Sequence, residues 1–223
     1  MSATTHLRQN TSVLATAEKR ALIWMATRLP RWVHSDHLSG LGLVSMAGAG
    51  LAFVVAASEP VAGALLVVLC LILNWFGDSL DGTLARVRDQ QRPRYGYYVD
   101  HVIDLAGTAM LFAGVAASGY MSPAIAALVV AAYFMVSAET YLATHSRGVF
   151  KMAFLGVGPT ELRILLAAGA LALINTPMVS PFGVSPIALW DLGGVIGSIG
   201  MLGAFVVSSA RNTRALYIEE TRR

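Results

Sequence analysis

The segment GDSLDGTLARVRDQQRPRYGYYVDHVID, residues 77–104, decides how the rest of the chain is interpreted. It ends one long apolar stretch, crosses a short basic loop and begins another apolar stretch. Four small or acidic residues in its first part stand at i, i+3, i+4 and i+7: Asp78, Asp81, Gly82 and Ala85. This spacing predicts that they share one face of a helix.

A second pair of acidic residues follows on the next predicted helix, where Asp100 and Asp104 stand at i and i+4. One helix arrives at the loop and the other departs from it, so both pairs of aspartates are expected at a similar depth. Ionised carboxylates at the edge of an apolar helix normally mark a functional site. Four of them repel one another unless cations lie among them, and hard oxygen ligands favour Mg²⁺, Mn²⁺ or Ca²⁺ over Zn²⁺. The pattern therefore predicts a site for two divalent cations about 4 Å apart, as in many enzymes of phosphoryl chemistry.

The composition indicates a membrane protein, because 56% of the 223 residues are hydrophobic and 13% are charged. A soluble domain usually has about 25% charged residues. Six apolar stretches are predicted as spans, at residues 41–58, 61–79, 99–118, 123–143, 163–176 and 188–209. A hydrocarbon core of ~30 Å needs about 20 helical residues, and the fifth stretch is the shortest. The expected fold is an all-α polytopic bundle of six transmembrane helices.

The positions of the basic residues support this threading. All 16 Lys and Arg residues fall within four segments, 8–31, 86–94, 147–163 and 211–223. Six spans place these four segments on the same side of the membrane. By the positive-inside rule, both termini are expected in the cytoplasm, for a protein of the cell (inner) membrane. A net positive charge distributed in this way does not indicate a nucleic-acid partner.

The chain is expected to form one membrane domain with short flanks. Residues 1–40 are predicted as a cytoplasmic segment, 41–210 as the six-helix catalytic domain and 211–223 as a cytoplasmic tail. Within the first segment, residues 15–33 alternate basic with apolar side chains, which predicts an amphipathic helix on the anionic leaflet. The alternative is a poorly ordered basic tail.

These residues resemble the signature of the CDP-alcohol phosphotransferases, the CDP-alcohol phosphatidyltransferase class I family. The pattern is Asp-x2-Asp-Gly-x2-Ala-Arg, a spacer, then Gly-x3-Asp-x3-Asp. It is matched by Asp78, Asp81, Gly82, Ala85, Arg86, Gly96, Asp100 and Asp104. The nine-residue spacer between Arg86 and Gly96 is slightly longer than is usual for the family.

The resemblance implies an enzyme that transfers a substituted phosphate from a CDP-alcohol to an acceptor hydroxyl and releases CMP. It implies two divalent cations, Mg²⁺ or Mn²⁺, held by Asp78, Asp81 and Asp100, with Asp104 sharing the second ion. Asp104 is also implied as the general base.

The resemblance further implies a set of residues around the CDP moiety. These are Asp78, Gly82, Ala85, Arg86 and Gly96.

A few polar residues outside the signature are candidates for the acceptor site. They occur at the same predicted end as the aspartates: His101, Glu139, Tyr141, His145 and Glu161. The Glu-x-Tyr and Gly-Pro-x-Glu elements are similar to those of choline and ethanolamine phosphotransferases. For the two glutamates the alternative is ion pairing with Arg147 or Arg163, and for the two histidines it is an ordinary interfacial position.

The expected substrates are CDP-diacylglycerol and a polar alcohol acceptor, in contact with the lipid bilayer. The alternative within the enzyme class is a CDP-choline or CDP-ethanolamine donor with a lipid alcohol acceptor. An alternative of another class is a cation-coupled transporter, which the clustering of the acids at one end disfavours. Small residues in stretches such as AGAGLA (47–52) and LGGVIGSIG (192–200) permit close helix packing, within one chain or in the expected homodimer.

Overall fold

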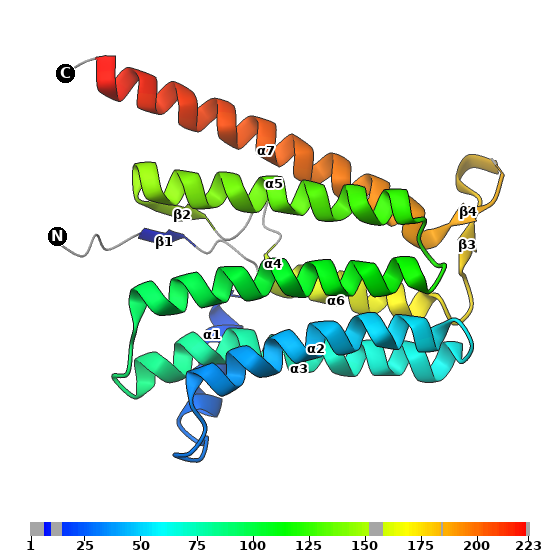
Figure 1. Ribbon diagram of the computed structural model, residues 1–223, viewed down its shortest axis with the longest axis horizontal. Helices are drawn as coiled ribbons and strands as arrows, with labels where there is room; N and C mark the ends of the chain where they lie inside the picture. The colour runs from blue at the N-terminus through cyan, green and yellow to red at the C-terminus, as the bar shows by residue number, and fades with distance from the viewer. Residues whose placement is uncertain (1–6, 10–14, 152–157, 184, 222–223) are drawn as a thin grey trace.

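Five long helices form the body of the chain in the computed structural model, which describes residues 7–9, 15–151, 158–183 and 185–221 (Figure 1). They are α2 (Ser35–Ala56), α3 (Pro60–Val87), α4 (Pro93–Ala117), α5 (Pro123–Arg147) and α7 (Leu189–Thr221). Each is long and apolar enough to cross a membrane. Proline is the first residue of α3, α4 and α5, where its fixed φ suits the helix and its missing N–H costs nothing. The all-α membrane bundle is thus confirmed.

A shorter helix, α6 (Pro159–Ala172), takes the place of the predicted fifth span. Its 14 residues extend about 21 Å, less than the ~30 Å of a hydrocarbon core. A turn and a small hairpin follow, made of β3 (Met178–Val179), the 3₁₀ turn η1 (Pro181–Gly183) and β4 (Ile187–Ala188). Within the described residues, five helices therefore have spanning length, and the exact count of six spans is not confirmed.

The predicted amphipathic helix is α1 (Ala15–Ala26), which ends earlier than residue 33. The helix could not continue to residue 33, because Pro30 disfavours helical backbone at the residue that precedes it. One face of α1 buries Leu22 and Ala26 against α2 and α3, while Trp24 on the other face is 58% exposed. A short strand before α1, β1 (Leu7–Gln9), pairs in parallel with β2 (Val149–Lys151).

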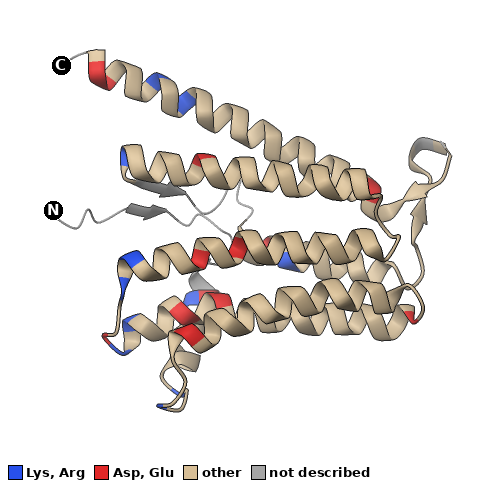
Figure 2. Cartoon of the chain, viewed as in Figure 1, with Lys and Arg blue, Asp and Glu red and all other residues tan. Residues whose placement is uncertain are grey.

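Charged side chains divide the bundle into two unlike ends. Figure 2 shows Lys and Arg gathered around the ends of α3, α5 and α7 and the start of α4, on the left. We call this the basic end. The opposite loops, residues 57–59, 118–122 and 173–188, contain no Lys or Arg. The arrangement agrees with the predicted threading, and the orientation in the membrane stays a prediction.

Glycine allows α2 to pack directly on the backbones of α3 and α4. A Cβ added to Gly114 of α4 would lie 2.2 Å from the Gly50 carbonyl oxygen of α2. A Cβ added to Gly77 of α3 would lie 2.5 Å from the Leu38 carbonyl oxygen of α2. Close approach of this kind is typical of helix packing in membranes. No hydrophobic driving force brings helices together there, and small residues let their backbones pack in van der Waals contact. These contacts fix the relative positions of the helices that carry the aspartates.

We predict that Gly114→Ala lowers the stability of the protein, because the added methyl group forces α4 away from α2. Overpacking of this kind costs about 1–3 kcal/mol. The measurement is thermal unfolding in detergent. Gly193→Ala on α7 is the matched control, since a Cβ there meets nothing within 4 Å. Equal melting temperatures for the two variants would contradict the prediction.

Candidate active site

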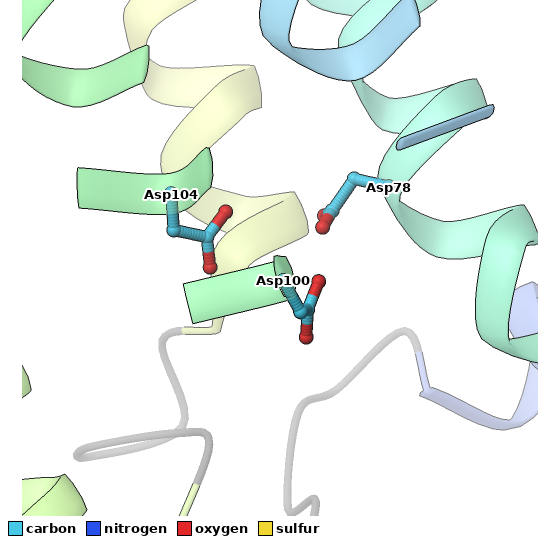
Figure 3. A group of neighbouring side chains, drawn as sticks. All are labelled: Asp78, Asp100 and Asp104. Carbon is cyan, nitrogen blue, oxygen red and sulfur yellow. The ribbon is translucent and has the colours of Figure 1, made fainter. Parts of the chain in front are cut away.

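Three of the four aspartates form a compact group between α3 and α4. Asp78, Asp100 and Asp104 each offer a carboxylate oxygen, and these oxygens all lie within 4.8 Å of one another. Figure 3 shows Asp104 of α4 and Asp78 of α3 turned toward each other, with Asp100 beside them. The predicted convergence of carboxylates from two helices is therefore present. Three hard oxygen ligands at this spacing suit a divalent cation such as Mg²⁺ or Mn²⁺.

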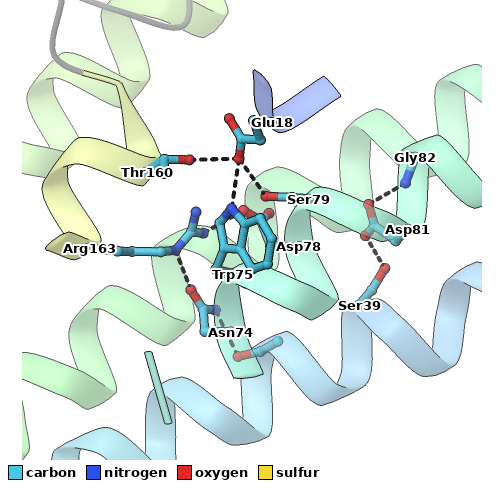
Figure 4. Close-up of polar contacts among 11 residues, drawn as sticks. Glu18, Ser39, Asn74, Trp75, Asp78, Ser79, Asp81, Gly82, Thr160 and Arg163 are labelled. Carbon is cyan, nitrogen blue, oxygen red and sulfur yellow. Dashed lines mark hydrogen bonds and ion pairs between the residues drawn. The ribbon is translucent and has the colours of Figure 1, made fainter. Parts of the chain in front are cut away.

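The fourth aspartate, Asp81, has its carboxylate turned toward α2. It accepts a hydrogen bond of 2.6 Å from the Ser39 hydroxyl and another from the backbone N–H of Gly82 (Figure 4). The Ser35 hydroxyl donates to the backbone carbonyl of Asp81 at 2.9 Å. Positions three residues apart on a helix differ by about 60° in direction, which is enough to aim Asp78 and Asp81 at different neighbours.

Arg163 of α6 brings a positive charge to the aspartate group. Its guanidinium pairs with the Asp78 carboxylate, and its Nε donates to the Asn74 side-chain oxygen at 2.7 Å (Figure 4). The Asn74 amide in turn donates to the Gly42 carbonyl at 3.0 Å. Sequence reasoning placed Arg163 among the basic residues of this side and did not connect it with Asp78. The signal in the sequence was an arginine in the second turn of α6, immediately before a wholly apolar run from Ile164 to Ala172.

The expected nucleotide side of α3 is open around Gly82 except for the Arg86 side chain. A Cβ added to Gly82 would meet Arg86 at 3.5 Å and no other side chain of the described residues within 4 Å. The Arg86 guanidinium donates to the Thr83 hydroxyl at 3.0 Å, which keeps it along the same helix. Gly96 is exposed in the first turns of α4, with open space where a Cβ would lie. Together with Ala85, these residues leave the backbone of α3 and the start of α4 accessible to a ligand.

Two of the acceptor candidates lie together beside the aspartates of α4. The His101 and Tyr141 rings are 4.5 Å apart between centroids, and the Tyr97 ring lies 4.1 Å from His101. We call these three residues the aromatic cluster. His145 is exposed near the end of α5.

The two glutamates among the candidates contact other parts of the fold. Glu139 is buried and accepts a hydrogen bond of 2.6 Å from the Asn212 amide of α7. Arg147 donates to the oxygen of the same amide, so Glu139 and Arg147 meet through Asn212 rather than directly. Glu161 accepts a 3.0 Å bond from the Gly158 N–H at the start of α6. An acceptor role for these residues stays a prediction.

Glu18 of α1 is a polar residue near the site that sequence reasoning missed. Its Oε1 accepts hydrogen bonds from Trp75 Nε1 at 2.7 Å and from the Thr160 hydroxyl at 2.8 Å (Figure 4). The Ser79 hydroxyl lies 3.5 Å from the same oxygen. One carboxylate thus joins α1 to α3 and α6 within a turn of Asp78. The signal in the sequence that could have identified Glu18 is its acidic side chain within the basic segment 15–33.

A groove of about 190 Å³ runs between α3 and α6 next to Arg163. The surface that lines it is apolar, including the parts of Thr160 and Arg163 that border it. The other lining residues are Val68, Leu71, Ile72, Trp75, Ile164 and Ala167. The groove therefore presents a hydrocarbon-like wall beside Arg163, the residue that pairs with Asp78.

Comparison with known proteins gives one family and one fold. Residues 38–207 match the family model of the CDP-alcohol phosphatidyltransferases, well over half of the chain. No curated protein matches.

Among solved structures, phosphatidylinositol phosphate synthase (PgsA1) of Mycobacterium tuberculosis with CDP-DAG bound is 19% identical, with a TM-score of 0.58. That match covers 87% of this chain and 92% of the synthase. The apo form of the same synthase is 18% identical over 89% and 94% of the two chains, with a TM-score of 0.53. At this level of identity, the likeness shows the fold.

We predict that Asp100→Asn weakens Mn²⁺ binding by at least about tenfold, because it removes one of three converging anionic ligands. Mn²⁺ binding to the purified protein is measured by electron paramagnetic resonance of the unbound ion. Asp36→Asn is the matched control, because Asp36 lies at the same end but pairs with Arg92 instead. Equal affinities for both variants would show that the group does not bind the ion.

Proposed function

The chain belongs to the CDP-alcohol phosphatidyltransferase family, and from that premise we propose that it transfers a phosphatidyl group from CDP-diacylglycerol to an alcohol acceptor. The family makes it a membrane enzyme that transfers substituted phosphate groups, rather than a cation-coupled transporter. The choice of donor is supported by the synthase of the same fold, which is described with CDP-DAG bound.

The observation that carries the proposal is the convergence of Asp78, Asp100 and Asp104 from two helices. We propose that these carboxylates hold two Mg²⁺ or Mn²⁺ ions together with Asp81. A carboxylate offers about four lone-pair positions, so the bonds from Ser39 and Gly82 leave Asp81 able to ligate as well. When bound, such ions neutralise the charge that develops on a pyrophosphate as it is cleaved.

Asp104 is the proposed general base. It lies within the group and one turn along α4 from Asp100, where a carboxylate could orient an acceptor hydroxyl beside a pyrophosphate held by the same group. Asp104 takes the hydroxyl proton, and the acceptor oxygen forms a bond to the phosphorus that carries the diacylglycerol. The bond from that phosphorus to the bridging oxygen breaks, and CMP leaves with the electron pair.

The space beside the half-buried Gly82 and the exposed Gly96, which carry no side chains, is the proposed position of the CDP moiety. Ala85 on the same face of α3 adds no bulk, and Arg86 supplies a cation beside it. Asp78 completes this set, since it lies one turn before Gly82 on α3 and joins the carboxylate group. A nucleotide bound here would present its pyrophosphate to the aspartates.

The groove between α3 and α6 supports a lipid substrate. Its apolar wall suits an acyl chain, and Arg163, which borders it, contacts Asp78. A lipid held in this way keeps its hydrocarbon away from water while its phosphate reaches the aspartates.

The aromatic cluster favours a second candidate within the same reaction class. The faces of tyrosine rings attract quaternary ammonium groups, so Tyr97 and Tyr141, whose centroids are 6.4 Å apart, suit a choline-like alcohol. This alcohol would be that of a CDP-choline or CDP-ethanolamine donor, with a lipid alcohol as the acceptor. Further acceptor contacts are proposed for Glu139, His145 and Glu161. We also propose a homodimer in the cell membrane, with both termini in the cytoplasm.

We predict CMP release by the purified protein in nanodiscs, dependent on Mg²⁺ or Mn²⁺. The donors tested are CDP-diacylglycerol, CDP-choline and CDP-ethanolamine, each with a panel of acceptor alcohols. Asp104→Asn is expected to lower kcat about 10²- to 10⁴-fold, the usual contribution of a general base. Asp36→Asn serves again as control.

The donor that releases CMP decides between the two candidates. Release from CDP-diacylglycerol supports the phosphatidyl transfer, and release from CDP-choline or CDP-ethanolamine alone supports the second candidate. A folded protein that releases CMP from none of the donors would contradict the proposed function.

A further inference from the structure

Arg163 is the feature of the site that the proposed reaction does not use. Its side chain is 14% exposed and that of Asp78 is 23% exposed, so the ion pair between them is largely shielded from water. A shielded charge without a partner is costly, whereas a paired and hydrogen-bonded one is tolerated. Loss of either partner therefore costs more folding free energy than loss of a partner in an exposed surface ion pair would.

The position of Arg163 does not depend on Asp78 alone. The guanidinium also donates through Nε to Asn74, and the buried Asn74 amide is itself anchored on the Gly42 carbonyl (Figure 4). The amide oxygen of Asn74 is thereby directed at Arg163 from the helix turn before Asp78. Contacts from α2 and α3 hold the guanidinium of α6 beside the carboxylate group.

A cation fixed in this position has opposite effects on the aspartates and on a metal ion. It offsets part of the mutual repulsion of Asp78, Asp100 and Asp104. It also repels any second cation and occupies an oxygen of Asp78. The same charge thus stabilises the aspartate group and weakens its affinity for divalent ions.

We propose that Arg163 is an internal counter-cation of the aspartate group, which competes with divalent cations for Asp78. The inference rests on the cation binding proposed above. It gives the bundle a way to keep a cluster of carboxylates folded before the ions and the anionic pyrophosphate arrive. Asn74 acts in it as a positioning residue.

The inference is tested by whether removal of the Arg163 charge tightens or weakens Mn²⁺ binding. Arg163→Gln should bind Mn²⁺ about tenfold or more tightly, because a unit charge a few ångströms from a divalent ion matters even at the dielectric constant of water. Arg163→Lys keeps the charge and should stay close to the original affinity. Arg147→Gln is the matched control, since it removes a charge at the end of α5 that contacts Asn212 instead.

Thermal unfolding of the same proteins in EDTA gives a second measurement. Arg163→Gln should melt at a lower temperature than the original protein without metal and gain more from added Mn²⁺. An unchanged melting temperature in EDTA would contradict the stabilising role.

The binding results separate failure of the inference from failure of the proposed function. If the original protein binds Mn²⁺ but a folded Arg163→Gln binds it equally or more weakly, the inference is wrong and the proposed function stands. Tighter Mn²⁺ binding by Arg163→Lys than by the original protein would overturn the charge argument. This comparison can still be made if Arg163→Gln does not fold. If the original protein binds no Mn²⁺, the proposed metal site itself is wrong.

Discussion

Negative charge held inside an apolar bundle is the constraint on which the rest of the structure depends. Four aspartates lie on helices whose outer faces are apolar, and each ionised carboxylate needs compensation there. Asp78 has Arg163, and Asp81 has Ser39 and the Gly82 N–H. Asp100 and Asp104 converge with Asp78 into a group whose natural complement is a divalent cation. The unequal partners explain why residues of one motif do not all point into one space.

Helix α2 supplies much of this compensation although it carries none of the motif. Ser39 reaches Asp81, and the Gly42 carbonyl anchors the amide that holds Arg163. Both contacts require α2 to lie against the backbone of α3. Gly77 permits this approach, because a Cβ there would collide with the Leu38 carbonyl. The chemistry of α3 and α4 thus depends on small residues whose role is packing.

Local periodicity explains which parts of the site could be predicted. The i, i+4 spacing of Asp100 and Asp104 fixes their common face within one helix, and the reversal at the loop brings Asp78 beside them. Arg163 could not be assigned in this way, since its contact with Asp78 spans 85 residues and depends on how α6 packs. The same holds for Glu139, whose partner Asn212 lies on α7. The predicted fifth span ended at residue 176, beyond the end of α6 at Ala172. The reason is that apolar residues continue after Ala172, where the chain already turns toward Pro177.

The groove and the ion pair lie side by side between α3 and α6. Apolar side chains such as Val68 and Ile164 line the groove, and Thr160 and Arg163 border it with apolar parts of their side chains. Thr160 is bonded to Glu18 of α1, and Arg163 is paired with Asp78, so both polar groups are engaged by residues that do not line the groove. Because these groups are already paired, the groove presents an apolar surface immediately beside a charged site. The packing of α1 and α6 on α3 thus keeps the apolar surface and the charges apart although they share the same two helices.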